Sequence, residues 1–77
     1  MMYFDGVHLV ADSLDELHNK CKELEIPRHY FEGVKKGHPH YDIIRKKDKQ
    51  VVAYNIRYGA IKQINKRELL GISKSMI

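Results

Sequence analysis

The chain has 77 residues, a single cysteine and a formal net charge of +4 at pH 7. A chain of this length forms one domain, residues 1–77, and buries only about 60% of its unfolded surface. One cysteine excludes an internal disulfide, and no apolar stretch is long enough for a bilayer span or a secretory signal. We therefore expect a cytoplasmic protein without membrane contact that gains stability as a homo-oligomer.

The charge is divided unevenly along the chain. Residues 1–31 carry three bases and six acids, a net charge of −3, whereas residues 32–77 carry eleven bases and four acids, a net charge of +7. A basic half attracts anions such as phosphates, nucleotides or nucleic acid. The alternative is a solvated charged face that serves solubility alone.

The first elements are extended. Residues 3–4 and 7–11, which are apolar except for His8, favour strands, and Asp5-Gly6 between them is typical of a turn or kink. Two short strands or one bent strand fit this pattern equally well.

A helix follows these strands. Ser13 and Glu16 have the spacing of a capping box at its start. Apolar residues then recur every three or four positions up to residue 24, and Cys21 falls on that stripe as a buried thiol. Pro27 ends the helix, because the residue before a proline avoids the α region.

The second half continues the alternation of strands and helices. We expect a strand at 29–31, a basic loop at 33–37, and a strand or the start of a helix at 41–44. A helix over 46–58 with Gly59 as its C′ residue precedes a strand at 60–64, and Asn65 caps a last helix. This order predicts a small single-layer α/β fold with a short, partly parallel β-sheet and two to three helices.

The motifs of residues 8–18, 27–31, 39–43 and 58–60 occur together in one known family. They comprise a His-x-x-Ala-Asp segment, Glu-Leu-His in the first helix, an arginine before aromatic residues, a His-Tyr-Asp triplet and a Gly-Ala pair. In this combination the chain resembles the bacterial and phage family called domain of unknown function 4031 over residues 3–61. Two features depart from it, the short Asp5-Gly6 segment before His8 and the absence of a tryptophan near residue 31. The resemblance implies a site but no activity.

Two side chains near the first strand are candidates for ligand binding. His8 and Asp12 share one face if the strand is regular, and Asp12 then lies at the carboxyl end of the strand, where open α/β sheets bind ligands. The alternative for Asp12 is an acid that complements the dipole of the helix behind it. His18, at the edge of the apolar stripe, is either a ligand-binding residue or a hydrogen-bonded boundary histidine.

The run from His38 to Asp42 has the His-x-His and His-x-Asp spacings of metal sites. Together with His8, the side chains of His38, His40 and Asp42 could bind zinc or another divalent transition metal. Paired cysteines and a His-Glu-x-x-His motif are absent, and the alternative is a surface loop with a solvated His38.

Arg28 is the strongest candidate for an anionic ligand, because a guanidinium holds a phosphate with two hydrogen bonds. The ring of Tyr30 could stack on a base, and Lys35, Lys36 and Arg45 could add positive charge. A solvated arginine after a helix is the alternative. The predicted ligand-binding set is His8, Asp12, His18, Arg28, Tyr30, His40, Tyr41 and Asp42.

Three function classes follow from these residues. The first, which we favour, is a small binding protein that captures a phosphorylated or nucleotide-like ligand, and it could sequester that ligand as an anti-defence protein. The second is a metal-dependent phosphoesterase or nuclease that uses a His/Asp cluster. The third is a nucleic-acid or host-protein binding module that uses the basic half of the chain.

Overall fold

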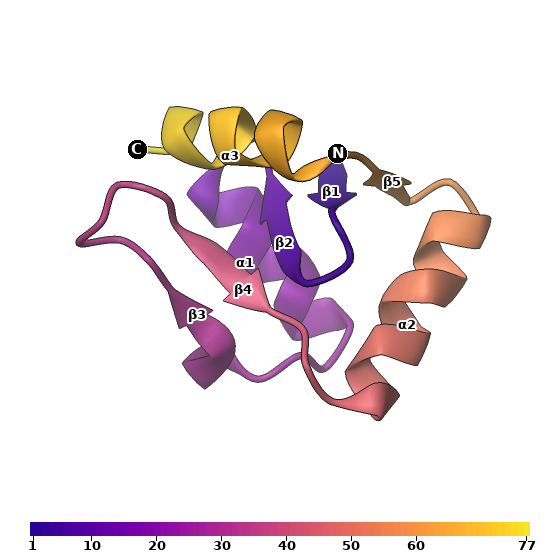
Figure 1. Cartoon of the computed structure of the whole chain (residues 1–77). Helices are drawn as coiled ribbons and strands as arrows, with labels where there is room; N and C mark the ends of the chain where they lie inside the picture. Colours follow the sequence, from indigo (N-terminus) through magenta and orange to yellow (C-terminus); the bar gives the residue numbers. More distant parts are fainter.

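The computed structural model describes residues 1–77, which form one five-stranded sheet and three α-helices (Figure 1). The strands are β1 (Met2–Phe4), β2 (His8–Ala11), β3 (Phe31–Glu32), β4 (His40–Asp42) and β5 (Ile61–Gln63). The helices are α1 (Leu14–Glu23), α2 (Lys46–Arg57) and α3 (Lys66–Ser75), with a 3₁₀ turn η1 (Arg28–Tyr30). The strand order is β3-β4-β2-β1-β5. The predicted fold class, a small α/β domain with a partly parallel sheet, is confirmed.

Only one strand pair is parallel. β1 pairs with β5 in parallel, while β1 with β2, β2 with β4, and β3 with β4 are all antiparallel. Of the two alternatives for the first extended segment, the structure has two short strands joined by the turn at Asp5-Gly6. The antiparallel pairs bring the two histidine-bearing strands, β2 and β4, side by side.

Helices α1 and α3 cover opposite faces of the sheet (Figure 1). Helix α1 lies on the face of Tyr41, whose hydroxyl bonds His18 of this helix. Helix α3 lies against β2 on the other face, and its buried Ser73 donates to the carbonyl oxygen of Pro39 at 2.7 Å. Helix α2 packs beside β5 at the sheet edge. The last helix therefore packs on its own sheet.

The core is continuous across the two faces. Cys21 is fully buried, as its spacing predicts, and burial raises the pKa of its thiol to about 12. No helix of the structure is both long and apolar enough to cross a membrane. The buried apolar side chains are Met2, Phe4, Leu9, Val10, Ala11, Leu17, Cys21, Ile26, Tyr41, Ile43, Val52, Ile61, Leu69 and Met76.

The start of α1 has half of the predicted capping box. The Ser13 hydroxyl accepts from the amide of Glu16 at 3.1 Å, which satisfies one free donor of the first turn. The carboxylate of Glu16 does not return to Ser13 and instead pairs with the amino group of Met1. The Ser13 cap therefore sets the helix start without the reciprocal bond.

The C-terminal end of α2 and the start of α3 have the capping residues that the sequence predicts. Gly59, with φ at 83°, follows the C-cap of α2, and its amide donates to the carbonyl of Ile56. The amide of Ala60 donates to Asn55, which completes a Schellman motif. The side chain of Asn65 accepts from the amide of Glu68 at 2.8 Å and caps α3.

Several predicted boundaries differ from the structure, and of the two alternatives for residues 41–44 the structure has a strand, at His40–Asp42. The strand predicted at 29–31 is wrong for its first two residues, because the amide of Tyr30 donates to Pro27 and closes the 3₁₀ turn. Only Phe31–Glu32 of this segment extends into the sheet. The predicted strand at 60–64 shortens to Ile61–Gln63, and the helix predicted over 46–58 ends at Arg57.

Candidate metal centre

Four polar side chains meet on one face of the sheet because of the strand register. His8 of β2 pairs with Asp42 of β4, and Glu32 of β3 pairs with His40. Side chains alternate between faces along a strand, so His40 and Asp42 share a face while Tyr41 points to the other one. Three neighbouring strands thus present two imidazoles and two carboxylates to the same region.

Asp5 fixes the ring of His8. Its Oδ2 lies 2.8 Å from Nδ1 of His8, while its Oδ1 accepts from the amides of Val7 at 2.9 Å and His8 at 2.7 Å. Burial of Asp5 favours a higher pKa, but these hydrogen bonds prevail and lower the pKa of the carboxyl. An ionised Asp5 accepts the Nδ1 proton of His8, which leaves Nε2 with its lone pair when the ring is neutral.

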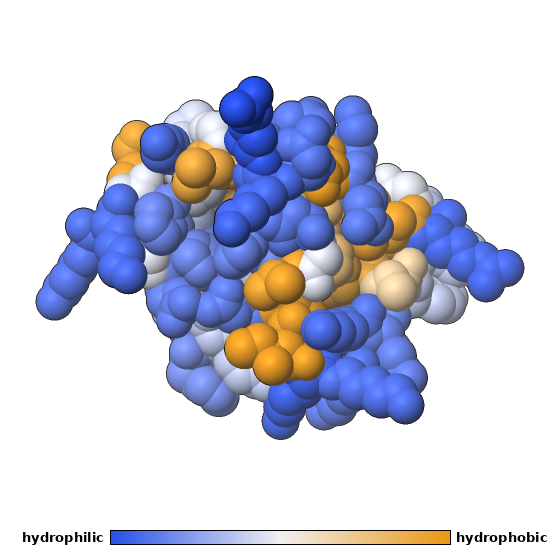
Figure 2. All heavy atoms as spheres, in the orientation of Figure 1, coloured by the Kyte–Doolittle hydropathy of each residue, from blue (hydrophilic) through white to orange (hydrophobic).

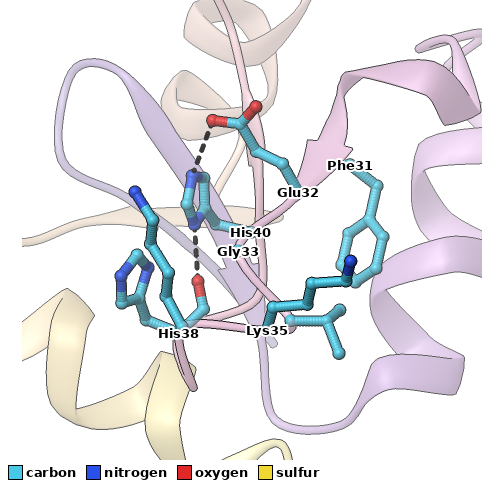
Figure 3. A pocket seen from close by; sticks show the side chains of 8 residues that line it. Phe31, Glu32, Gly33, Lys35, His38 and His40 are labelled. Atoms are coloured by element: carbon cyan, nitrogen blue, oxygen red, sulfur yellow. Dashed lines mark hydrogen bonds and ion pairs between the residues drawn. The ribbon is translucent and has the colours of Figure 1, made fainter.

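The ring of His40 is held in the same way by a backbone acceptor (Figure 3). Its Nδ1 donates to the carbonyl oxygen of His38 at 2.6 Å, and the side chain is 8% exposed. Gly33 makes this contact possible, because its φ is +91° and an added Cβ would lie 2.3 Å from the oxygen of His38. The Nε2 atom of His40 is therefore also left free to accept a metal ion.

The free ring nitrogens and Asp42 converge. Oδ1 of Asp42 lies 3.3 Å from Nε2 of His40 and 3.8 Å from Nε2 of His8, and the three ligand atoms all lie within 4.8 Å of one another. Zinc bonds of about 2.0–2.1 Å at tetrahedral angles separate neighbouring ligand atoms by about 3.3 Å. Two histidines and one carboxylate with open positions are a donor set of catalytic zinc and non-haem iron sites.

Glu32 adds a second carboxylate beside this triad. Its Oε1 lies 3.5 Å from Nε2 of His40, and its side chain is 62% exposed (Figure 3). A hydrogen bond with Asp42 and the negative charge of Asp42 raise the pKa of Glu32. Two carboxylates this close repel each other when both are ionised, and a cation between them relieves the repulsion.

Surface pockets open on both sides of the triad. One of about 450 Å³ is lined by His29, Tyr30, Glu32, Asp42, Ile44 and Arg45. Another of about 440 Å³, drawn in Figure 3, lies under the loop of residues 33–38 and includes Glu32, Lys35, Lys36 and His40. The pocket under the loop has two lysines beside one carboxylate and favours an anionic ligand. The other pocket has Glu32 and Asp42 beside Arg45, so it favours an anion only when a metal ion offsets the two carboxylates.

A family model described as "Protein of unknown function (DUF4031)" matches residues 4–76. The chain belongs to this family. No curated protein and no solved structure matches the chain. The family assignment confirms the resemblance seen in the sequence motifs, and it assigns no activity to the DUF4031 fold.

This DUF4031 chain separates the predicted ligand-binding residues into two groups. His8, His40 and Asp42 form the triad, whereas His18, Arg28 and Tyr41 meet on the opposite face of the sheet. There, Nδ1 of His18 lies 2.8 Å from the Tyr41 hydroxyl. The guanidinium of Arg28 lies 5.9 Å from the centre of the Phe31 ring, and the arginine lines a pocket with His18 and Tyr41.

Asp12 lies outside both groups. It follows β2 four residues beyond His8, a separation of about 13 Å along a strand. Its carboxylate accepts from the Tyr3 hydroxyl at 3.0 Å and from the amino group of Met1 at 3.1 Å. The sheet is mostly antiparallel, so its strands do not end at one shared carboxyl edge as we expected for Asp12.

Tyr30 and His38, the remaining predicted residues, lie close to the triad but are not part of it. Tyr30 lines the pocket of Asp42 and packs under Arg45. The imidazole of His38 stacks on that of His40, with ring centres 5.6 Å apart, and is not one of the three metal-ligand groups. His38 contributes its carbonyl oxygen instead.

No sequence pattern identified Asp5 or Glu32 as site residues, or indicated that Arg45 shares a pocket with Asp42. The Asp5-Gly6 pair indicated only a turn, although an acid three residues before His8 at a turn is typical of a side chain that accepts from the following amides. Glu32 faces His40 only through the register of β3 and β4, and no local pattern marks that register. Arg45 was one of several basic residues in a run.

Proposed function

We propose that this chain is a metal-dependent hydrolase that acts on a phosphorylated small molecule or nucleotide at the triad of His8, His40 and Asp42. The observation that carries the proposal is the fixed direction of both rings. Each histidine has its Nδ1 proton committed to a defined acceptor, and each Nε2 faces the Asp42 carboxylate. Pre-set ring orientation of this kind is what metal-binding histidines require.

The residues around the triad have separate tasks in such a reaction. His8, His40 and Asp42 would hold a divalent ion, which would polarise a phosphoryl oxygen and lower the pKa of a water molecule. Glu32, whose Oε1 lies 3.5 Å from Nε2 of His40, accepts a proton from the attacking water. The water oxygen bonds to phosphorus while the bond to the leaving oxygen breaks, and the leaving oxygen takes a proton from solvent.

The experiment compares chelator-treated protein before and after addition of Zn²⁺, Mn²⁺ or Co²⁺. The substrates are p-nitrophenyl phosphate, bis-p-nitrophenyl phosphate and a set of nucleotides. We expect release of product only with metal, and at least a hundredfold loss of rate in His40→Ala. Tyr58→Ala is the control, because it also removes an aromatic ring but Tyr58 is exposed and lies outside the triad and its pockets. Metal binding without turnover of any substrate would reject the hydrolase and leave a metal-dependent ligand-capturing protein.

A second candidate function is the capture of an anionic ligand without turnover at the opposite face. Arg28 is exposed, and the structure places no carboxylate within 4.0 Å of it, so its charge is available to a ligand. It lines a pocket of about 430 Å³ with His18, Asn19 and Lys22. Calorimetry with nucleotides should show a one-to-one complex that Arg28→Gln abolishes and His40→Ala leaves unchanged.

The charge of the second half supports a third candidate, a nucleic-acid or host-protein binding module. Its affinity for nucleic acid would fall steeply with salt and would not depend on His8.

We also propose a cytoplasmic homo-oligomer, supported by the reduced, buried Cys21 and by the small core. Light scattering of the purified protein tests the oligomeric state.

A further inference from the structure

We propose that Arg45 holds the terminal phosphate of the substrate beside the triad, and that Asp48 and Tyr30 position its guanidinium. This inference rests on the proposed hydrolase function and identifies the substrate class, a phosphate monoester. Arg28, the arginine that the sequence favoured for anion binding, lies on the other face of the sheet. Arg45 instead shares a pocket with Asp42 of the triad.

Arg45 and the triad share a pocket. Arg45 lines the pocket of about 450 Å³ that also contains Asp42 of the triad and the adjacent carboxylate of Glu32. A phosphate in this pocket would lie between the metal ligands and the guanidinium. One oxygen could then face the ion while others accept hydrogen bonds from Arg45.

The guanidinium of Arg45 is held in a fixed position. Nε of Arg45 donates to Oδ2 of Asp48 at 3.1 Å, and Asp48 is only 1% exposed although it is ionisable. The guanidinium carbon lies 5.4 Å from the centre of the Tyr30 ring. Burial and a hydrogen bond to Asp48 raise the pKa of the Tyr30 hydroxyl, which places Tyr30 in the same network.

Arg45 has hydrogen-bond donors that the structure does not use. Its hydrogen bond in the structure uses Nε, so the two Nη groups keep their protons for a ligand. A guanidinium that is already oriented loses less side-chain entropy on binding than a free lysine does. The neighbouring Lys46, Lys47 and Lys49 are exposed and have no such support.

The rim of the pocket suits the organic part of a monoester. Ile44 is 70% exposed beside Asp42, and Figure 2 shows apolar atoms gathered where β4 leads towards α2. Val7, 43% exposed, lies near this segment because its carbonyl accepts from the amide of Ile43. An apolar or aromatic group next to the phosphate would cover these side chains.

The test uses Arg45→Gln, Arg45→Lys and Asp48→Asn, with Lys47→Gln as the control from the same basic run. In protein loaded with Co²⁺, we expect Arg45→Gln to raise the KM for p-nitrophenyl phosphate by about tenfold or more. The affinity for Co²⁺ should stay within about twofold of the unaltered chain. Arg45→Lys should recover only part of the loss, since it cannot form the two-pronged contact.

Asp48→Asn tests the positioning role. We expect a raised KM with a smaller change in kcat, whereas a general structural defect would lower the melting temperature and Co²⁺ affinity together. Binding of inorganic phosphate to the Zn²⁺-loaded chain, followed by ³¹P NMR, keeps the inference testable without turnover. Weaker phosphate binding in Arg45→Gln than in Lys47→Gln supports the inference, and equal binding overturns it. Absence of Co²⁺ binding would instead reject the proposed function.

Discussion

The ring of His40 donates through Nδ1 to the carbonyl oxygen of His38 at 2.6 Å, and this contact turns its Nε2 towards Asp42. The loop that supplies the carbonyl begins at Gly33, whose oxygen accepts from the amides of Lys36 and His38. The proposed metal centre therefore depends on the conformation of a short glycine-bounded loop as well as on its three candidate ligands.

Gly33→Ala should damage both stability and metal binding. The added Cβ would lie 2.3 Å from the His38 oxygen at a φ of +91°, so the loop or the His40 ring must move. We expect a loss of about 1–3 kcal/mol in the free energy of unfolding, measured with urea, and weaker Co²⁺ binding. Gly37→Ala is the matched control, because its φ is +78° but its Cβ would meet nothing within 4 Å. Equal metal affinity in the two variants would contradict the role of the loop.

Asp5→Asn should weaken metal binding while the fold persists. The amide can still accept from the backbone of Val7 and His8, but it replaces the carboxylate that fixes Nδ1 of His8. Loss of a supporting partner of a metal-bound histidine costs about 10–100-fold in affinity. Isothermal calorimetry with Zn²⁺ measures this change, and circular dichroism checks the fold. An unchanged Zn²⁺ affinity would show that Asp5 serves the turn alone.

Glu25→Gly should stabilise the protein. Glu25 has φ at 59°, and it follows the C-cap of α1, where the amide of Ile26 donates to Cys21 at 2.8 Å in a Schellman motif. Glycine adopts this conformation without the penalty of a Cβ, so we expect a gain of about 1 kcal/mol. For a chain of this size the melting temperature should rise by about 4–8 °C. Gly59→Ala, at the equivalent position of α2, should change the melting temperature in the opposite direction.

The stability of the protein should fall at mildly acidic pH because of His18. Burial lowers the pKa of this imidazole, and the positive charge of Arg28 adds to the effect. The folded state therefore binds the proton less well than the unfolded state. The stabilisation is complete above the unfolded pKa of about 6.5 and is lost as the pH falls through the folded pKa.

Urea unfolding between pH 7.5 and pH 5 checks this expectation. The unaltered chain should lose more free energy of unfolding over this range than His18→Gln, which has no ionisable ring at this position. His29→Gln, which changes an exposed histidine outside the core, should follow the unaltered chain. Identical pH profiles for all three proteins would contradict the assignment to His18.

Local sequence signals predicted the elements well where the side chain itself supplies the contact. Ser13, Asn65 and Gly59 mark helix ends through their own hydroxyl, amide or backbone freedom, and the structure has each of them in that role. The metal-ligand spacing of His40 and Asp42 was also readable, because residues two apart on a strand share a face.

The remainder of the site depends on contacts between distant segments. Glu32 faces His40 only through the pairing of β3 with β4, and chain spacing does not encode that pairing. His8, which the sequence already suggested as a metal ligand, reaches Asp42 through the pairing of β2 with β4. The same topology separates Arg28 from the triad, because Tyr41 and its neighbours in β4 point to opposite faces. A set of titratable residues close in sequence was therefore predicted as one site but lies on both sides of the sheet.

The most direct test of the metal centre is a titration with Co²⁺ followed by visible absorption. We expect one ion per chain and the intense d–d bands of a low-coordinate site with histidine and carboxylate ligands. His8→Ala and His40→Ala should each abolish these bands, while His38→Ala, which keeps the carbonyl oxygen, should retain them. The absence of bands in the unaltered chain, or bands that survive loss of both His8 and His40, would contradict a metal centre at this triad.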